Sequence, residues 1–320
     1  MKIDVQQLLQ NDRRTLAKAI TLIESNLPAD QKDAQTLLQK ILPHTGKSFR
    51  LGITGVPGVG KSTFIENFGL YLIGQGHKVA VLAIDPSSPR SGGSILGDKT
   101  RMEKLSQVND AFIRPTPSSG FLGGVAQTTR ESILLCEAAG FDFIIVETVG
   151  VGQSEFEVHD MVDFFLVLML PNAGDELQGI KKGILELADA LVINKADGEQ
   201  VAQATKAMAQ YQSALHLMAS HSTWTPKVMT CSGLNGTHLD QVYSMLQEYK
   251  KLPNEKRVSQ NKKWFLKLIQ NQIQQHLDQD QILLEKKKEL EKKVLEEKTL
   301  PLAAAHEYIN LVFSHFREGK

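Results

Sequence analysis

The 320-residue sequence predicts an α/β protein: a doubly wound, mostly parallel sheet with helical extensions at both ends. Short apolar runs alternate with helical segments between about residues 48 and 252, the pattern of strand–helix–strand units. Several runs are apolar at nearly every position, which is typical of strands covered by helices on both faces. The expected strands are 49–55, 78–85, 111–115, 141–148, 163–170, 188–195 and 226–231.

The first extension, residues 1–47, is predicted to be helical because its apolar residues recur every three or four positions. The sheet domain follows as residues 48–252, and ligands of such sheets bind at the carboxyl ends of the strands. The last part, residues 253–320, reads as two or three long helices. Its stretch "LLEKKKELEKKVLEEK" suits a solvated helix held by ion pairs, or equally an arm for self-association.

Composition limits the possible partners and compartments. Lys and Arg together number 36, as do Asp and Glu, so the strong basic excess of a nucleic-acid binder is missing and we expect no nucleic-acid partner. The longest apolar run, residues 164–170, is far too short to span a membrane, so we expect no membrane association. Cys136 and Cys231 are predicted to be reduced core thiols in a cytoplasmic protein.

A phosphate-binding loop follows the first expected strand. The stretch "GVPGVGKST" fits G-x-x-x-x-G-K-[ST] and opens a helical segment. Its glycines let backbone N–H groups wrap phosphate oxygens, and the helix N-terminus adds partial positive charge. Lys61 is expected to reach the β- and γ-phosphates, and the Ser62 hydroxyl to bind Mg²⁺. The predicted nucleotide contacts here are Gly55, Val56, Pro57, Gly58, Val59, Gly60, Lys61, Ser62 and Thr63.

A guanine-reading motif, N-K-x-D, follows a later strand in "VINKADG". The Asp197 carboxylate can accept hydrogen bonds from N1–H and the exocyclic amine of guanine, whereas adenine has neither donor there. Asn194 and the Lys195 stem are expected to buttress the loop and cover the base, so GTP and GDP are the expected nucleotides. The next strand ends in "TCSG", whose backbone N–H groups are expected to meet the guanine oxygen. The candidates are Ser232, Gly233 and Leu234. Gly233 stands where Ala is usual, and this should be tolerated because the contact to the guanine oxygen is made by the main chain.

Three carboxylates are expected to converge near the phosphate loop and, with Ser62, to form an oxygen-rich Mg²⁺ site. Asp85 and Glu147 each end a strand, and Asp98 lies in the segment that follows Asp85. Asp98 also suits a second role, as a cap for the helical stretch "KTRMEKLSQV".

The stretch "ETVGVGQSE" is predicted to be a nucleotide-sensing switch. Glu147 and Gly150 have the spacing of the D-x-x-G switch, so Gly150 is expected to follow the γ-phosphate while Glu147 touches the metal shell or the attacking water. No lysine follows the glycines, which excludes a second phosphate loop, and Glu155 stands where a dinucleotide fingerprint needs glycine. Val151 occupies the place of the water-orienting glutamine of Ras, which predicts slow intrinsic hydrolysis.

A further loop follows the strand at 163–170. Gly174, Gly179 and Gly183 interrupt its helical pattern, which suits a mobile loop. Lys181 or Lys182 could reach the phosphates on closure, although both also suit surface charges on an amphipathic helix. The expected catalytic residues are Lys61, Asp98, Glu147, Gly150 and Lys181.

Several long segments together resemble the MeaB/ArgK-type GTPases, the methylmalonyl-CoA mutase-associated family. They include "VLAIDPSSPRSGGSILGDKTRM", "IRPTPSSGFLGGVAQTTRE" and "DFFLVLMLPNAGDELQGIKKGILELAD". The resemblance implies a homodimer joined through the C-terminal helices. It also implies a GTP-dependent chaperone that gates adenosylcobalamin delivery to a cobalamin-dependent acyl-CoA mutase and protects that mutase. It places Asp85, Asp98 and Glu147 on the family's metal and switch carboxylates, and Lys181 on the lysine of its third switch.

Two other functions stay open. A P-loop kinase of the transport-system kinase type needs an acceptor pocket and a base near the γ-phosphate, and seldom carries N-K-x-D. A metal-insertion GTPase needs exposed Cys and His ligands near the switches. The sequence has no C-x-x-C and no His-rich tract, and the nearest single candidate is His159.

Overall fold

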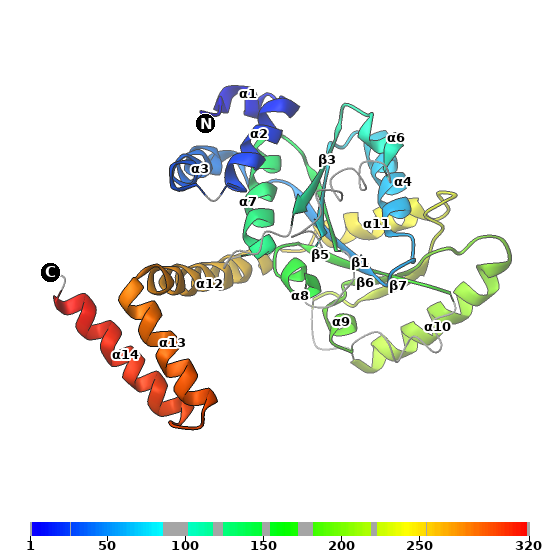
Figure 1. Cartoon of the computed structure of the whole chain (residues 1–320). Helices are drawn as coiled ribbons and strands as arrows, with labels where there is room; N and C mark the ends of the chain where they lie inside the picture. The colour runs from blue at the N-terminus through cyan, green and yellow to red at the C-terminus, as the bar shows by residue number, and fades with distance from the viewer. Residues whose placement is uncertain are drawn as a thin grey trace. The chain divides into compact units, whose positions relative to one another are not determined.

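The computed structural model describes residues 2–25, 27–85, 102–117, 124–148, 154–171, 182–218, 223–253 and 255–318. Within these residues, seven parallel strands form one sheet in the order β3-β2-β4-β1-β5-β6-β7 (Figure 1). This confirms the predicted fold class. The strands are β1 Phe49–Gly55, β2 Val79–Asp85, β3 Ala111–Pro117, β4 Phe143–Thr148, β5 Phe164–Met169, β6 Ala190–Ile193 and β7 Lys227–Thr230.

Strand β1 is central, with β4 and β5 as its neighbours. Ile53 pairs with Glu147 of β4, and Gly55 pairs with Leu168 of β5. Because all the strands run parallel, their carboxyl ends meet at one edge of the sheet. The phosphate loop, the Glu147 carboxylate and the N-K-x-D segment therefore share that edge, although they are far apart in the sequence.

Helices cover both faces of the sheet because alternate strand residues point to opposite sides. Leu51 and Ile53 pack in one apolar layer with α4 and α11, whereas Ile144 and Val146 pack in the other with α7. The helices on the first face are α4 Lys61–Gly74, α6 Glu103–Ser106 and α11 Leu239–Lys250. Those on the second are α1 Val5–Leu9, α2 Arg13–Ile23, α3 Pro28–Ile41, α7 Gly124–Ala138, α8 Ser154–His159, α9 Lys182–Leu187 and α10 Val201–Met218. The first unit also contains two 3₁₀ turns, η1 Leu42–His44 and η3 Gly198–Gln200.

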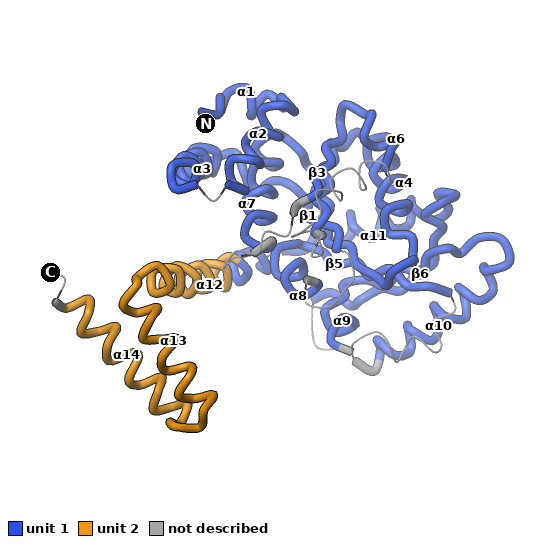
Figure 2. The backbone as a smooth tube through the Cα atoms, in the orientation of Figure 1, with its two compact units in different colours: residues 1–260 blue, residues 261–320 orange. Residues whose placement is uncertain are grey.

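The chain divides into two compact units, residues 1–260 and 261–320 (Figure 2). The second unit is helical, as the sequence predicted for this end of the chain. Asp280 is the N-cap of its helix α13 and accepts from the Leu283 N–H at 3.1 Å. Lys286 on α13 is 2.7 Å from Glu307 on α14, so an ion pair joins these two helices. The C-terminal helices are α12 Lys256–Gln279, α13 Gln281–Leu295 and α14 Pro301–Glu318.

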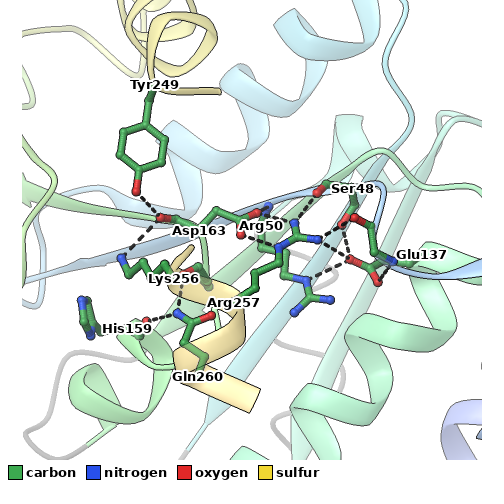
Figure 3. Close-up of polar contacts among 11 residues, drawn as sticks. Ser48, Arg50, Glu137, His159, Asp163, Tyr249, Lys256, Arg257 and Gln260 are labelled. Carbon is green, nitrogen blue, oxygen red and sulfur yellow. Dashed lines mark hydrogen bonds and ion pairs between the residues drawn. The ribbon is translucent and has the colours of Figure 1, made fainter. Parts of the chain in front are cut away.

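The first turn of α12 belongs to the first unit, where it is bonded to the amino ends of the strands (Figure 3). Arg257 forms a two-pronged ion pair with the buried Asp163 and also donates to the Gly46 and Ser48 carbonyls. Gln260 donates to the Val162 carbonyl at 2.8 Å. The domain boundary expected at residues 252 and 253 stays a prediction, but the compact fold of the first unit continues to residue 260.

Candidate functional site

The candidate site begins at the loop between β1 and α4. Gly58 and Gly60 have φ angles of 78° and 92°, the left-handed region that favours glycine. A Cβ atom on Gly60 would lie 3.0 Å from Nδ2 of Asn194, so this glycine also permits a close approach of the N-K-x-D segment. Val59 is fully buried in the core and fixes the middle of the loop, while Pro57 is exposed.

Lys61 is nearly buried at the N-terminus of α4. Its ammonium group donates to the Gly55 carbonyl at 2.8 Å and to the Val56 carbonyl at 3.4 Å. Burial lowers the pKa of Lys61, and the negative charges of Glu147 and Glu155 act in the opposite direction. A buried cation at the start of a helix, surrounded by backbone N–H groups, is suited to bind phosphate.

Asn194 connects the N-K-x-D segment to two other loops. Its side chain is 2% exposed. The amide nitrogen donates to the Val59 carbonyl at 2.8 Å, and the amide oxygen accepts from the Gly233 N–H, also at 2.8 Å. One side chain therefore joins the phosphate loop, the end of β6 and the loop after β7.

Lys195 and Asp197 are also held in place. Lys195 has a φ of 60° and donates from Nζ to the Gly58 carbonyl at 2.8 Å, so its stem lies along the phosphate loop. The Asp197 carboxylate accepts from the buried Ser232 hydroxyl. Each carboxylate oxygen has more than one acceptor position, so this bond orients Asp197 without using up its capacity to accept from a base. Leu234 is 70% exposed beside this loop.

Gly233 has a steric role that the sequence argument did not predict. A Cβ atom at this position would lie 2.9 Å from Cα of Phe64, which is backbone of α4 and cannot move aside. Its carbonyl accepts from Nδ2 of Asn67 at 2.8 Å. The sequence predicted that glycine is tolerated here, and the close approach of α4 shows that glycine is the residue this packing requires.

Ser62 and Glu147 are the expected metal ligands that the structure brings together. The Ser62 hydroxyl lies 3.4 Å from Oε1 of Glu147, which is 7% exposed. Asp85 ends β2 at the same edge of the sheet, but its side chain lies outside the described part. Among the side chains that are described, no group of three or more His, Cys, Asp and Glu is arranged to hold a metal. Asp98, Gly150, Val151 and Lys181 lie outside the described residues.

Three contributors were missed by sequence reasoning. Asn67 braces the loop after β7, and its place two turns into α4 carries no motif signal. Thr148 donates to Thr54 at 2.7 Å, which ties the end of β4 to that of β1. Glu155 appeared only as a misfit to a dinucleotide fingerprint, yet it is 2% exposed and its charge acts on Lys61. The apolar Val158, one helical turn after Glu155, is the sequence signal for the buried face of α8.

The chain is similar in sequence to a known family and to individual proteins. The family described as "Methylmalonyl Co-A mutase-associated GTPase MeaB" matches residues 16–281. The Escherichia coli protein "GTPase ArgK" is 49% identical over 280 residues, covering 85% of each chain. The Mus musculus protein "Methylmalonic aciduria type A homolog, mitochondrial" is 46% identical over 315 residues, covering 93% of this chain and 76% of that protein.

One solved structure is similar over almost the whole chain. It is described as "Crystal structure of LAO/AO transport system kinase" and shares 38% identity and a TM-score of 0.77, covering 96% of each chain. This similarity shows that the fold is shared with that protein.

Proposed function

The chain belongs to the MeaB family of GTPases and hydrolyses GTP, and from this premise we propose that it is a GTP-dependent chaperone of a cobalamin-dependent acyl-CoA mutase. The proposed role is to gate adenosylcobalamin delivery to a mutase of the methylmalonyl-CoA mutase type and to protect that mutase. The support is the family's own description as mutase-associated, together with the name of the mouse relative, which refers to methylmalonic aciduria.

The nucleotide is proposed to bind along the loop that Asn194 braces. Phosphates would lie against Gly55–Thr63, with Lys61 at the β- and γ-phosphates, and the base would lie at Asp197. The observation that carries this proposal is the bonding of Asn194 and Lys195 to the carbonyls of Val59 and Gly58. These two bonds hold the N-K-x-D segment at a constant distance from the phosphate loop. A single nucleotide can contact both segments only if that distance is fixed.

Mg²⁺ is proposed as the accompanying metal, with Ser62, Asp85, Asp98 and Glu147 as its protein environment. The two groups whose geometry is described fit it, because a hydroxyl and a carboxylate oxygen lie 3.4 Å apart beside the phosphate loop and Mg²⁺ prefers oxygen ligands. When bound, the ion would neutralise charge on the β- and γ-phosphates. Glu147 would hold a metal-bound or attacking water in place.

The remaining catalytic assignments stay proposals for residues outside the described part. Gly150 is proposed to sense the γ-phosphate through its N–H group, Asp98 to support the metal, and Lys181 to approach the phosphates on closure. With Val151 in place of a water-orienting glutamine, intrinsic hydrolysis is proposed to be slow until a partner protein contributes. A turnover near 1–100 s⁻¹ without any partner, roughly the range of kinases, would contradict this.

A homodimer joined through the C-terminal helices is also proposed. Within the second unit, Phe265, Ile273 and Phe313 are 61%, 55% and 62% exposed, and exposed apolar side chains of this size favour association. The proposed compartment is the cytoplasm, where Cys136 and Cys231, both buried and unpaired, would stay reduced. In the described part of the chain, no helix combines the length and apolar character that crossing a membrane needs.

The decisive experiment measures GTP turnover alone and with each cobalamin-dependent mutase of the same cell. Stimulation by one mutase is expected, and no response to any of them would refute the chaperone role. Lys61→Ala should abolish productive GTP binding, and Asp197→Asn should lower the preference for guanine over xanthine. The solved relative is named a kinase, and a kinase would transfer the γ-phosphate to an acceptor molecule. Release of the γ-phosphate as inorganic phosphate would instead indicate a GTPase, so this measurement separates the kinase from the GTPase.

A further inference from the structure

The loop after β7 offers three backbone N–H groups to a base, and two of them are already bonded within the protein. The Ser232 N–H donates to the Thr237 carbonyl at 3.1 Å, and the Gly233 N–H donates to Oδ1 of Asn194 at 2.8 Å. Among the residues that the structure describes, nothing accepts from the Leu234 N–H. This third group is therefore the open donor of the loop.

The direction of the Leu234 N–H is set by the carbonyl of Gly233, because both belong to one peptide unit. Nδ2 of Asn67, on α4, donates to that carbonyl at 2.8 Å. The unit is planar and trans, so its C=O and N–H bonds point in opposite directions. The carbonyl points towards α4. The N–H therefore points away from α4, and Leu234 itself is 70% exposed.

Asn67 is itself held in place by α4. Its Nδ2 also donates to the Thr63 carbonyl, one helical turn earlier, at 3.2 Å. Both neighbours are acceptors, so the side-chain nitrogen with its two hydrogens, and not the side-chain oxygen, must face them. One turn before Asn67, Cα of Phe64 lies 2.9 Å from the position of a Cβ atom on Gly233. A close backbone contact and a side-chain bond thus fix the same peptide unit against α4.

The carboxylate expected to read the base lies beside this peptide unit, because the Ser232 hydroxyl donates to Asp197. In guanine, the 6-oxygen is bonded to the carbon next to N1, whose N–H is the group that Asp197 is proposed to accept. We propose that Asn67 is a positioning residue for base recognition: by holding the Gly233 carbonyl, it presents the Leu234 N–H to the 6-oxygen of guanine. The inference rests on the proposed binding of GTP at this site.

The bond from Asn67 acts on selectivity in two ways. A peptide unit whose carbonyl accepts a hydrogen bond is polarised, so its N–H becomes a stronger donor. Adenine carries an amino group where guanine has the 6-oxygen, so a fixed N–H there would face another donor and both would lose their bonds to water. Without Asn67, the peptide unit is free to rotate and to turn the Leu234 N–H towards solvent.

The test measures the affinities of the full-length protein for GDP and for 6-thio-GDP. The two nucleotides differ at one atom, and the sulfur of 6-thio-GDP accepts hydrogen bonds more weakly than oxygen does. The wild type is expected to prefer GDP. Asn67→Leu removes the donor at similar side-chain size and is expected to lower this preference by about fivefold, through weaker binding of GDP.

The matched control is Glu66→Leu, at the neighbouring position of α4. Glu66 accepts from the Lys104 N–H at 2.8 Å, so this variant also removes a bond between α4 and the main chain, but one that does not touch the loop after β7. It should change the preference for GDP by less than about twofold. An unchanged preference in Asn67→Leu, with equal losses of affinity for both nucleotides, would reduce Asn67 to a structural role and overturn the proposal, as would equal changes of preference in both variants.

A measurement on the wild type answers the same question if Asn67→Leu does not fold. Amide hydrogen exchange at Leu234 is followed by nuclear magnetic resonance with no nucleotide, with GDP and with 6-thio-GDP. GDP is expected to slow this exchange by about tenfold, and 6-thio-GDP to slow it less. An N–H that exchanges equally fast with and without GDP would refute its contact with the base. Failure of the proposed function looks different, because the wild type would then bind neither nucleotide.

Discussion

Replacing Arg257 with alanine tests how the first turn of α12 is joined to the sheet, within the first unit. The guanidinium group forms a two-pronged ion pair with Asp163 and donates to the carbonyls of Gly46 and Ser48. It also lies 3.9 Å from Glu137, and the side chains of Asp163 and Glu137 are 2% and 1% exposed. Arg257→Ala would therefore leave two buried carboxylates without their shared cation.

The expected loss of stability follows from these contacts. Removing one partner of a buried ion pair costs about 3–5 kcal/mol, because the remaining charge is left uncompensated. Asp163 keeps the hydrogen bond from the Arg50 N–H at 2.8 Å. Glu137 keeps Arg50 at 2.9 Å, the Gly46 N–H at 2.7 Å and the Ser48 hydroxyl at 2.5 Å. These surviving contacts favour the lower half of the range, so we expect a loss of about 3 kcal/mol in the free energy of unfolding.

The assay is urea unfolding of the full chain, followed by tryptophan fluorescence. The protein has two tryptophans, and a Trp264→Phe background leaves Trp224 as the reporter. Trp224 donates to the Asp189 carbonyl at 2.9 Å, within the first unit, so it reports on the sheet domain. Lys251→Ala removes an exposed positive charge nearby and should change the free energy by less than about 0.5 kcal/mol.

Two outcomes would refute this reasoning. A loss below about 1 kcal/mol for Arg257→Ala would place its ion pair among the weak surface pairs. Strict additivity with Asp163→Asn would show that the two side chains do not depend on each other, whereas a direct pair predicts that the double variant loses less than the sum.

Three further substitutions test the site and its surroundings. Gly60→Ala should lower the free energy of unfolding by about 1–2 kcal/mol, since alanine disfavours a φ of 92°. The added Cβ atom should also displace Asn194 and so weaken GTP binding. An unchanged affinity for GTP would contradict the second expectation. Gly233→Ala should lower the free energy of unfolding by about 1–3 kcal/mol, because the added Cβ atom overpacks against α4. The control is Gly74→Ala, where a Cβ atom would meet nothing within 4 Å; it should be neutral or stabilising in the same thermal melt. Burial raises the pKa of Glu131 from 4.5 to about 7, against a hydrogen bond from Gln127 that lowers it. The folded state therefore holds the proton of Glu131 more tightly than the unfolded state does, and the free energy of unfolding should fall by about 2 kcal/mol as the pH rises from 4.5 to about 7. Glu131→Gln should flatten this fall. An identical pH profile in the wild type and in Glu131→Gln would show that Glu131 is not its source.

Much of the fold is determined locally by the sequence. All seven expected strands form, each within a few residues of its predicted limits. Strands β4, β5 and β6 are buried at every position, as apolar runs covered by helices on both faces should be. The phosphate loop and the N-K-x-D segment are also local signals, since glycine spacing and the lysine position are needed wherever a backbone wraps a phosphate. Their shared edge follows from the parallel order of the strands.

Contacts between segments distant in the sequence were decided by the tertiary structure alone. Asn194 bonds to Val59 and Gly233, and Arg257 bonds to Asp163. Glu155 is buried, and Val158 of the same helix lies against Gly52 of β1, a contact that no local pattern around "ETVGVGQSE" contains. A motif shows which chemistry a segment can perform. Which charges face one another is set by packing, because the energy of a buried charge depends on neighbours that the chain brings together only when it folds.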